Sequence, residues 1–325
     1  MNMGEIVFLK SNRVRIVGVG SAVPRTVVSN TEIISHLQTS DLWIKTNLGI
    51  HERRICRFDD ETSSQLGAKA AIRALEYAGV DPKEVQGIIV ATATPEQKAP
   101  STACLIQNIL GITNGCFAFD IQAVCSGFIY GLTVAAGLIE STGVTNVLLI
   151  GVDTFSKITD WDDRSSPFFG DGAGAVLIRH DSNEEGEFTA IIKADGSGHE
   201  GFFVAPNDTH YTMNPHAVYE AATRVLPGVI KELLDRSGKK IDDVKYIVPH
   251  QPSIRVLDKM AESIDVPKDM VLKNMDRFAN TAGASIPLLL AENVVNGTIN
   301  NGDLILMAGV GSGWTWGAAL YRWKN

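Results

Sequence analysis

The sequence predicts an α/β fold that consists of two similar halves. Short apolar runs rich in β-branched residues alternate with longer helical segments, which favours mostly buried sheets covered by helices. A strand, a loop, a glycine- and alanine-rich entry and a second strand occur at 146–179 and again at 303–322. The composition over 325 residues, 45% hydrophobic and 20% charged, is that of an ordinary globular protein. We therefore expect an N-terminal half at 1–182 and a C-terminal half at 183–325.

Local signals predict the individual elements. Residues 61–78 predict a helix because Thr62 or Ser63 can cap its start and Gly79 can end it. The other helices are expected at 102–110, 126–140, 217–236, 253–264 and 281–296. The strands are expected at 15–19, 87–91, 116–121, 146–152, 174–179, 188–195, 245–249, 304–308 and 317–322.

Charge and cysteine usage argue against several classes of protein. The chain has 29 Lys and Arg against 37 Asp and Glu, a net charge of −8, so we expect no broad basic face for nucleic acid or an anionic membrane. Four cysteines in so long a chain (Cys56, Cys104, Cys116 and Cys125) argue against a disulfide framework, and the absence of a C-x-x-C pair argues against a zinc site or a redox motif. We expect no secretory leader, and no run of about 18 uninterrupted apolar residues that would span a membrane occurs. The expected location is cytoplasmic.

Cys125 is the first candidate for chemistry. A predicted strand leads into a tight turn of small residues at Cys125, and a helix begins at once. A helix N-terminus favours the thiolate, which is the nucleophilic form of cysteine. A buried structural cysteine is the alternative, since free cysteine is among the most buried residue types. The other three cysteines lack this setting and are interpreted as structural.

His250 and Asn280 are the next candidates. His250 ends an apolar strand, and ligands of open α/β sheets bind at the carboxyl ends of strands. Asn280 opens the second small-residue helix, and by the repeat we expect it to occupy the place that Cys125 has in the first half. A hydrogen-bonded structural histidine and a simple N-cap are the respective alternatives. The glycine-rich turn 309–317 can bring backbone N–H groups close to a ligand.

Together these features resemble the β-ketoacyl-acyl-carrier-protein synthase III family of the thiolase superfamily. The resemblance rests on Cys125, His250 and Asn280, each in its own setting. Further matching blocks span nearly the whole chain: Ser40-Asp-Leu-Trp-Ile44, Gly49-Ile-His-Glu-Arg-Arg54, Pro100-Ser-Thr-Ala-Cys-Leu-Ile-Gln107, Phe169-Gly-Asp-Gly-Ala-Gly174 and Trp314-Thr-Trp-Gly-Ala-Ala319. The resemblance implies the duplicated thiolase fold, with five αβαβα layers, and a homodimer.

The resemblance also implies a decarboxylative Claisen condensation. Cys125 would take an acyl group from an acyl-CoA, and a malonyl thioester, carried on acyl carrier protein or on CoA, would then lose CO₂. His250 and Asn280 would stabilise the enolate, and the backbone N–H groups of Cys125 and Ser312 would hold the oxyanion. The adenine of CoA would lie between Trp43 and Arg164. No metal or redox cofactor is implied.

Two departures from the family concern the substrates. Ala99 stands where primer-limiting members often carry Phe, at a position expected to reach the acyl pocket of the partner subunit. The smaller side chain predicts a primer longer or bulkier than acetyl. Asn47 stands where an arginine commonly meets a CoA phosphate, which predicts a weaker contact there.

Two further departures concern carrier and pathway. The helix after His250 keeps Arg255 and Lys259, expected to dock the carrier protein, but reads Ala-Glu-Ser-Ile at 261–264 where housekeeping members carry a lysine pair. This leaves malonyl-CoA open as the extender. Ser253, expected to contact CoA, lies in a Gln-Pro-Ser sequence that is similar to a specialised branch making alkylquinolone precursors. Both fatty-acid initiation and secondary metabolism with an aromatic primer therefore remain open.

The sequence also bears on three other functions. A degradative thiolase needs a second cysteine late in the chain, and none follows Cys125. A hydroxymethylglutaryl-CoA synthase needs a glutamate acid upstream of the nucleophile, and Glu96 is a poor positional match. A non-catalytic acyl-CoA binding protein would keep the fold and the pocket without needing Cys125.

Overall fold

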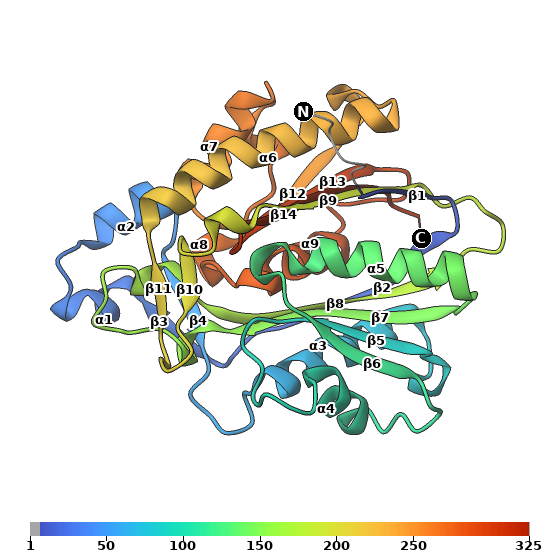
Figure 1. Ribbon diagram of the computed structural model, residues 1–325, viewed down its shortest axis with the longest axis horizontal. Coiled ribbons are helices and arrows are strands. Elements are labelled where there is room, and N and C mark those ends of the chain that lie inside the picture. The colour runs from blue at the N-terminus through green and yellow to red at the C-terminus, as the bar shows by residue number, and fades with distance from the viewer. Residues whose placement is uncertain (1–6, 325) are drawn as a thin grey trace.

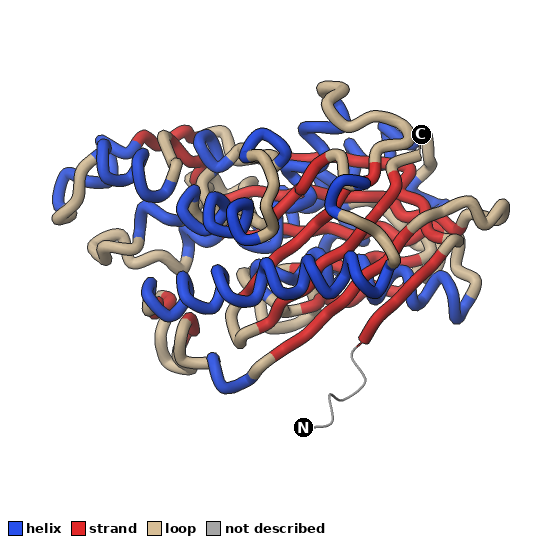
Figure 2. Tube along the Cα trace, turned by 90° about the horizontal axis from the view of Figure 1, so that it is seen from above, coloured by secondary structure: helices blue, strands red, loops and turns tan. Residues whose placement is uncertain are grey.

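The structure is a computed structural model that describes residues 7–324. Two five-stranded sheets enclose a central layer of two helices, α5 (Gly127–Thr142) and α9 (Ser285–Val295). Helices α3 (Ser63–Ala78) and α4 (Thr102–Ile109) cover the outer face of one sheet, and α6 (Pro215–Ser237) and α7 (Ile254–Ser263) cover the other (Figure 1). Seen from above, the strands run in a common oblique direction beneath the helices (Figure 2). The predicted five-layered αβαβα fold is confirmed.

The first sheet has the order β2-β8-β7-β5-β6. Strand β5 pairs in parallel with β6 and β7, whereas β8 is antiparallel to both of its neighbours. Its strands are β2 (Val14–Ala22), β5 (Gly87–Ala91), β6 (Phe117–Ile121), β7 (Asn146–Thr154) and β8 (Asp171–His180).

The second sheet repeats this pairing. Strand β12 is parallel to β13, and β14 is antiparallel to β13 and β9, in the order β1-β9-β14-β13-β12. Its strands are β1 (Val7–Ser11), β9 (Phe188–Ala194), β12 (Tyr246–Pro249), β13 (Leu304–Gly311) and β14 (Thr315–Arg322). The edge strand β1 comes from the start of the chain and pairs with β9 from the second half.

Apolar residues on all sides explain why α5 and α9 lie in the centre. Phe128 and Leu132 of α5 and Leu289 of α9 pack in one core with strands from both sheets. The stretch Val124–Thr142 is long and apolar enough to cross a membrane, but most of it is buried in this layer. The outer helix α3 is capped as predicted, because Thr62 accepts a hydrogen bond from the Gln65 N–H and Gly79 ends the helix with φ 64°.

A cap at one end of the layers was not predicted from the sequence. It is formed by short elements that lie together at the left of Figure 1. They are β3 (Thr26–Ser29), α1 (Asn30–Ile33), α2 (Asp41–Leu48), β4 (Glu52–Ile55), β10 (Phe202–Val204), β11 (Tyr211–Met213) and α8 (Met275–Phe278). The cap faces the ends of the sheet strands, and the residues predicted to carry chemistry lie at this end.

Candidate active site

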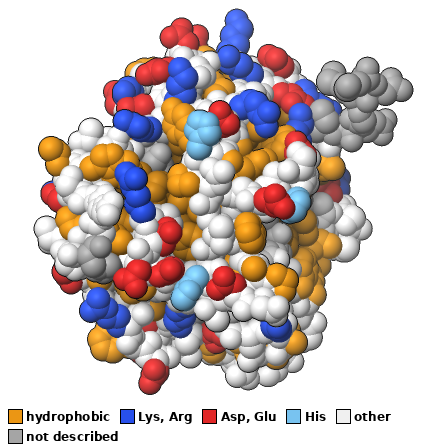
Figure 3. Space-filling model, turned by 60° about the vertical axis from the view of Figure 1, so that its left-hand side comes forward, with side chains coloured by type: hydrophobic (Ala, Val, Ile, Leu, Met, Phe, Trp, Pro, Cys, Tyr) orange, Lys and Arg blue, Asp and Glu red, His pale blue; other side chains and the backbone are white. Residues whose placement is uncertain are grey.

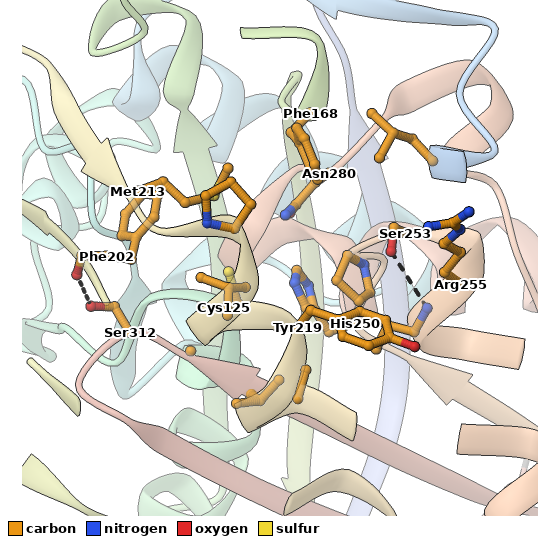
Figure 4. A pocket seen from close by; sticks show the side chains of 18 of the residues that line it. Cys125, Phe168, Phe202, Met213, Tyr219, His250, Ser253, Arg255, Asn280 and Ser312 are labelled. Atoms are coloured by element: carbon orange, nitrogen blue, oxygen red, sulfur yellow. Dashed lines mark hydrogen bonds between the residues drawn. The ribbon is translucent and has the colours of Figure 1, made fainter. Parts of the chain in front are cut away.

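A cavity of about 550 Å³ lies between the cap and the strand ends. Apolar side chains run through the middle of the face that carries the cap, between Lys and Arg side chains (Figure 3). Of the residues singled out from the sequence, the cavity is lined by Trp43, Asn47, Cys125, His250, Ser253, Arg255, Asn280 and Ser312. Figure 4 shows the side chains of Cys125, His250 and Asn280 converging on the same space.

Cys125 lies in the 3-10 turn Val124–Ser126 between β6 and α5. Val124 has φ 46°, a conformation that is rare for a β-branched residue and is found where the fold holds a functional turn in place. The turn leads directly into α5, so the sulfur lies at a helix N-terminus as predicted. Burial nevertheless raises the pKa of the Cys125 thiol, and the nearby charge of Asp153 raises it further. The expected preference for thiolate is therefore outweighed by burial, and the resting thiol is protonated at neutral pH.

His250 follows β12 and is fully buried. Its backbone N–H donates to the Ala308 carbonyl at 2.8 Å, which continues the pairing of β12 with β13. Burial lowers the pKa of His250 to about 3, against the smaller opposing effect of a backbone hydrogen bond with Ala282. The imidazole is therefore neutral at physiological pH. Its Nδ1 is buried and has no hydrogen-bond partner among the described residues.

Asn280 is held by both halves of the chain. Its backbone N–H donates to the Phe168 carbonyl, and its carbonyl accepts from the Gly170 N–H, each at 3.0 Å. The side-chain Oδ1 accepts a hydrogen bond from the Ala282 N–H at 2.8 Å. Because Oδ1 is engaged, the amide Nδ2 is the group that can donate to a ligand.

Asn280 does not occupy the place equivalent to Cys125, and that prediction was wrong by three residues. The matching 3-10 turn before α9 is Ala282–Ala284. Ala282 has φ 46°, the same value as Val124, which makes Gly283 the counterpart of Cys125. Small residues on both sides of the turn made the register of the repeat ambiguous in the sequence.

Glycines at the end of β13 allow close approach to the nucleophile turn. A Cβ on Gly311 would lie 3.0 Å from the backbone nitrogen of Cys125 and would also overlap Ala123. A Cβ on Gly309 would lie 3.1 Å from the Cys125 carbonyl oxygen. Ser312 follows at once, and its hydroxyl donates to the Phe202 carbonyl. The backbone of residues 311–312 and that of Cys125 thus border the same part of the cavity.

The mouth of the cavity carries Trp43 and Arg164. Trp43 lies on α2, and the guanidinium of Arg164 lies 5.8 Å from the centre of its ring. Asn47 lines the cavity one turn further along, but its Nδ2 donates to the Trp43 carbonyl at 2.8 Å. The amide is therefore held by its own helix rather than directed outward.

The remaining candidates divide into two groups. Ser253 caps α7 by accepting a hydrogen bond from the Val256 N–H, and the exposed Arg255 lies beside it at the cavity mouth. Lys259 lies one turn further along α7, outside the cavity lining, and pairs with Glu262 at 3.5 Å. Ala99 is exposed and does not line the cavity of its own chain.

An aromatic wall next to Cys125 was not found from the sequence. Phe169 and Phe202 line the cavity with Met213, and their ring centres lie 5.9 Å apart. Tyr211 stacks on Phe202 at 5.1 Å, and Phe155 stacks on Phe169 at 4.7 Å. These residues come from separate short segments, so no sequence window contains the pattern.

Asp153 is a second residue that sequence reasoning missed. It ends the apolar run of β7, is fully buried and accepts hydrogen bonds from the N–H groups of Ala93 and Gly283, each at 2.8 Å. The hydroxyls of Thr92 and Thr94 also donate to it, at 3.3 and 2.9 Å. The rule that predicted His250, a polar residue at the carboxyl end of a strand, also applies to Asp153.

The duplicated fold and this cavity define the class of protein. A cysteine at a helix start, a neutral histidine and an asparagine amide converge beside backbone N–H groups in a mainly apolar cavity that Arg255 also lines. Nucleophile, proton acceptor and oxyanion donors are the parts needed for acyl transfer through a thioester. The class is that of a thiolase-fold condensing enzyme.

Comparisons with known proteins agree with this class. The family model for 3-oxoacyl-[acyl-carrier-protein (ACP)] synthase III matches residues 119–196, and the model for its C terminal matches residues 234–323. The β-ketoacyl-[acyl-carrier-protein] synthase III of Allorhizobium ampelinum is 42% identical over 318 residues, which are 94% of this chain and 98% of that protein.

Two solved structures are similar over nearly the whole chain. The 3-oxoacyl-[acyl-carrier-protein] synthase III from Aquifex aeolicus gives a TM-score of 0.92 at 40% identity, covering 95% of this chain and 100% of the other. The priming β-ketosynthase of the R1128 polyketide pathway gives 0.90 at 32% identity, covering 99% of each. The chain belongs to the β-ketoacyl-acyl-carrier-protein synthase III family, which confirms the predicted family, the thiolase fold and an acyltransferase-type enzyme.

Proposed function

We propose that the protein joins an acyl primer from acyl-CoA to a malonyl thioester by decarboxylative Claisen condensation, the step that initiates fatty-acid synthesis. The observation that carries this proposal is the convergence of Cys125, His250 and Asn280 on one apolar cavity. Family membership supports the same reaction. The roles assigned to single residues are part of the proposal.

The first half-reaction transfers the acyl group to Cys125. The thiol loses its proton to the neutral His250 imidazole, and the sulfur attacks the acyl-CoA carbonyl. The N–H groups of Cys125 and Ser312 bind the oxyanion, and CoA thiol leaves with the proton. Because burial disfavours the free thiolate, deprotonation accompanies attack rather than preceding it.

The second half-reaction forms the carbon–carbon bond. The malonyl thioester loses CO₂, and the enolate oxygen accepts hydrogen bonds from the Asn280 amide and the neutral His250 imidazole. The enolate carbon attacks the acyl-Cys125 carbonyl, and the thiolate leaves to give a 3-oxoacyl thioester. The Cys125 thiolate takes a proton from solvent, so acyl-CoA, the malonyl thioester carboxylate and one proton become 3-oxoacyl thioester, CoA thiol and CO₂. No step requires a metal or a redox cofactor.

The mouth of the cavity fits a nucleotide-bearing thioester. The aromatic face of Trp43 and the guanidinium of Arg164 offer stacking partners for the adenine of CoA, if the two side chains separate to admit it. Arg255 at the mouth supplies positive charge for phosphate. Ser253 and Asn47 border the path, although the amide of Asn47 is already engaged.

The primer is set by two features with opposite effects. The wall of Phe169, Phe202 and Met213 fills space next to Cys125 within the chain. Ala99, exposed on the chain surface, would open space in a partner's cavity if the protein forms the homodimer that its family suggests. We propose a primer larger than acetyl, admitted through the partner side of the cavity.

The extender carrier and the pathway are also proposals. Arg255 and Lys259 offer positive charge for an acidic carrier protein, but Lys259 is paired with Glu262, which supports malonyl-CoA as an alternative to malonyl-acyl carrier protein. The likeness to the R1128 priming ketosynthase favours a second candidate, priming in secondary metabolism. A cytoplasmic location remains a prediction.

The test is covalent capture of the primer. Purified protein is incubated with a panel of acyl-CoAs of increasing length, including an aromatic one, and intact masses are recorded with and without hydroxylamine. We expect an adduct of the acyl mass that hydroxylamine removes and that Cys125→Ser lacks. Tight CoA binding without an adduct from any primer would instead identify a non-catalytic acyl-CoA binding protein.

A further inference from the structure

Asp153 joins the two halves of the chain at the site. Its Oδ1 accepts from Thr92, Ala93 and Thr94, which follow β5, while its Oδ2 accepts from the Gly283 N–H in the turn Ala282–Ala284. All four donors are neutral, and the carboxyl is fully buried. Among the described residues, one of the four hydrogen bonds to this carboxylate comes from the other half, and that bond can hold the turn in place.

The turn that Asp153 holds also orients the Asn280 amide. The Ala282 N–H donates to Asn280 Oδ1, and the next N–H along the turn, that of Gly283, donates to Asp153. A hydrogen bond with the backbone of Ala282 also acts on His250. A shift of this turn therefore moves both groups assigned to the enolate, whereas Cys125 belongs to a different turn.

The internal repeat supports this role independently. Strand β7 begins its pairing with β8 at Asn146, and β13 begins its pairing with β14 at Leu304, so these two residues are equivalent in the repeat. Asp153 and Gly311 each lie seven residues further along and are therefore counterparts. Gly311 approaches the Cys125 N–H and leaves room beside it, whereas the Asp153 carboxylate binds the equivalent Gly283 N–H. The turn at Cys125 thus leaves its N–H free for a substrate oxygen, whereas the N–H of the equivalent turn at Gly283 is bound by the Asp153 carboxylate.

We propose that Asp153 is a positioning residue for condensation, because its bond to the Gly283 amide holds the turn that directs the Asn280 carboxamide toward the Cys125 sulfur. This inference rests on the proposed condensation. Acyl transfer to Cys125 does not use the Asn280 amide, so it depends on Asp153 only through His250 and the pKa of the thiol, and less than condensation does. A variant that only loses the positioning of Asn280 should therefore lose condensation more than acylation, whereas a general loss of structure should reduce both half-reactions.

The isosteric variant Asp153→Asn tests the proposal. Its single oxygen satisfies the three donors on the Oδ1 side, which places its NH₂ against the Gly283 N–H, donor against donor. We expect kcat of condensation with malonyl-N-acetylcysteamine to fall about 100-fold, with KM nearly unchanged, and the rate of Cys125 acylation to change far less than that. The matched control is Asp181→Asn, a buried carboxyl at the far end of β8 that lies outside the cavity.

The outcomes are distinguishable. Wild-type protein that neither acylates nor condenses contradicts the proposed function itself. Wild-type protein that condenses, together with an Asp153→Asn variant that condenses equally well, overturns the role of Asp153. Equal losses of acylation and condensation in a variant that unfolds at the wild-type temperature also overturn it.

The wild-type pH profile provides a second test if Asp153→Asn does not fold. Burial raises the pKa of Asp153 to about 6, so the carboxyl gains a proton and loses an acceptor site below that pH. The titratable group that acts on it from the nucleophile turn is Cys125, which stays protonated in this range, and His250 with a pKa of about 3 stays neutral. We expect the ratio of condensation to acylation to fall below about pH 6, whereas a ratio that is constant from about pH 8 to about pH 5 contradicts the proposal.

Discussion

Cys125 combines a position that favours the thiolate with surroundings that disfavour it. The N-terminus of α5 points at the sulfur, whereas burial and the charge of Asp153 raise the pKa of the thiol. His250 is equally constrained, because burial keeps it neutral and therefore able to accept a proton or donate a hydrogen bond. At the residue scale, neither the thiol nor the imidazole is activated in the resting protein. The site becomes reactive when a thioester binds and the side chains act together.

This arrangement predicts how Cys125 reacts with a simple alkylating agent. The rate of carbamidomethylation by iodoacetamide should keep rising with pH above about 9, because a thiol with a raised pKa gains thiolate only there. The Cys125→Ser variant gives the background from the other cysteines, and peptide mapping identifies the modified site. A rate that levels off near neutral pH would show that the resting residue is already a thiolate.

At the scale of elements, the site forms where turns of both halves meet strand ends. Long apolar elements carry a clear period, so the sequence predicted the layer helices and every strand of the two large sheets except the edge strand β1, and it placed Cys125 and His250 at strand ends. The cap escaped prediction because strands as short as Phe202–Val204 and Tyr211–Met213 carry too few residues for a period. Asp153 and the aromatic wall depend on contacts between distant segments, which a single sequence does not reveal.

The close approach of β13 to the nucleophile turn predicts a specific sensitivity. Gly311→Ala places a Cβ against Ala123 and the Cys125 nitrogen, so we expect a loss of about 1–3 kcal/mol of stability and about 100-fold slower acylation. Gly228→Ala is the matched control, since this exposed position within α6 has nothing within 4 Å of an added Cβ. That variant should keep full activity and gain about 0.5–1 kcal/mol. Thermal unfolding and intact-mass kinetics measure both, and wild-type acylation by Gly311→Ala would contradict the proposed packing.

At the scale of the whole molecule, duplication gives the two halves different tasks. The first half supplies Cys125, and the second supplies His250 and Asn280, while segment 168–170 of the first half holds Asn280 in place. The pairing of strands repeats, yet the anion-binding N–H is open at Cys125 and occupied at Gly283. Sequence similarity between halves identified the repeat but not its register, because the small residues that permit close packing look alike.

The proposed primer length depends on the homodimer, because Ala99 is expected to act in the cavity of the partner subunit. Ala99 is exposed and outside its own cavity, so Ala99→Phe affects the primer only if the residue reaches a partner's cavity. We expect this variant to prefer shorter acyl-CoAs and Phe202→Ala to accept longer ones, with Ala99→Ser unchanged. Competition of an acyl-CoA panel for Cys125, together with the molar mass in solution, measures this. A monomer, or a length profile unaffected by Ala99→Phe, would remove Ala99 from the acyl site.

The most direct measurement is of the carbon–carbon bond itself. The protein is supplied with an acyl-CoA that forms the adduct and with malonyl-CoA or malonyl-acyl carrier protein labelled with ¹³C in the carbons that are retained, and the thioester product is analysed by mass spectrometry. We predict a 3-oxoacyl thioester that contains both labelled carbons, forms with release of CO₂, and is absent with Cys125→Ala. Undiminished product from Cys125→Ala, or acyl-Cys125 that never yields a 3-oxoacyl product with either extender, would contradict the account.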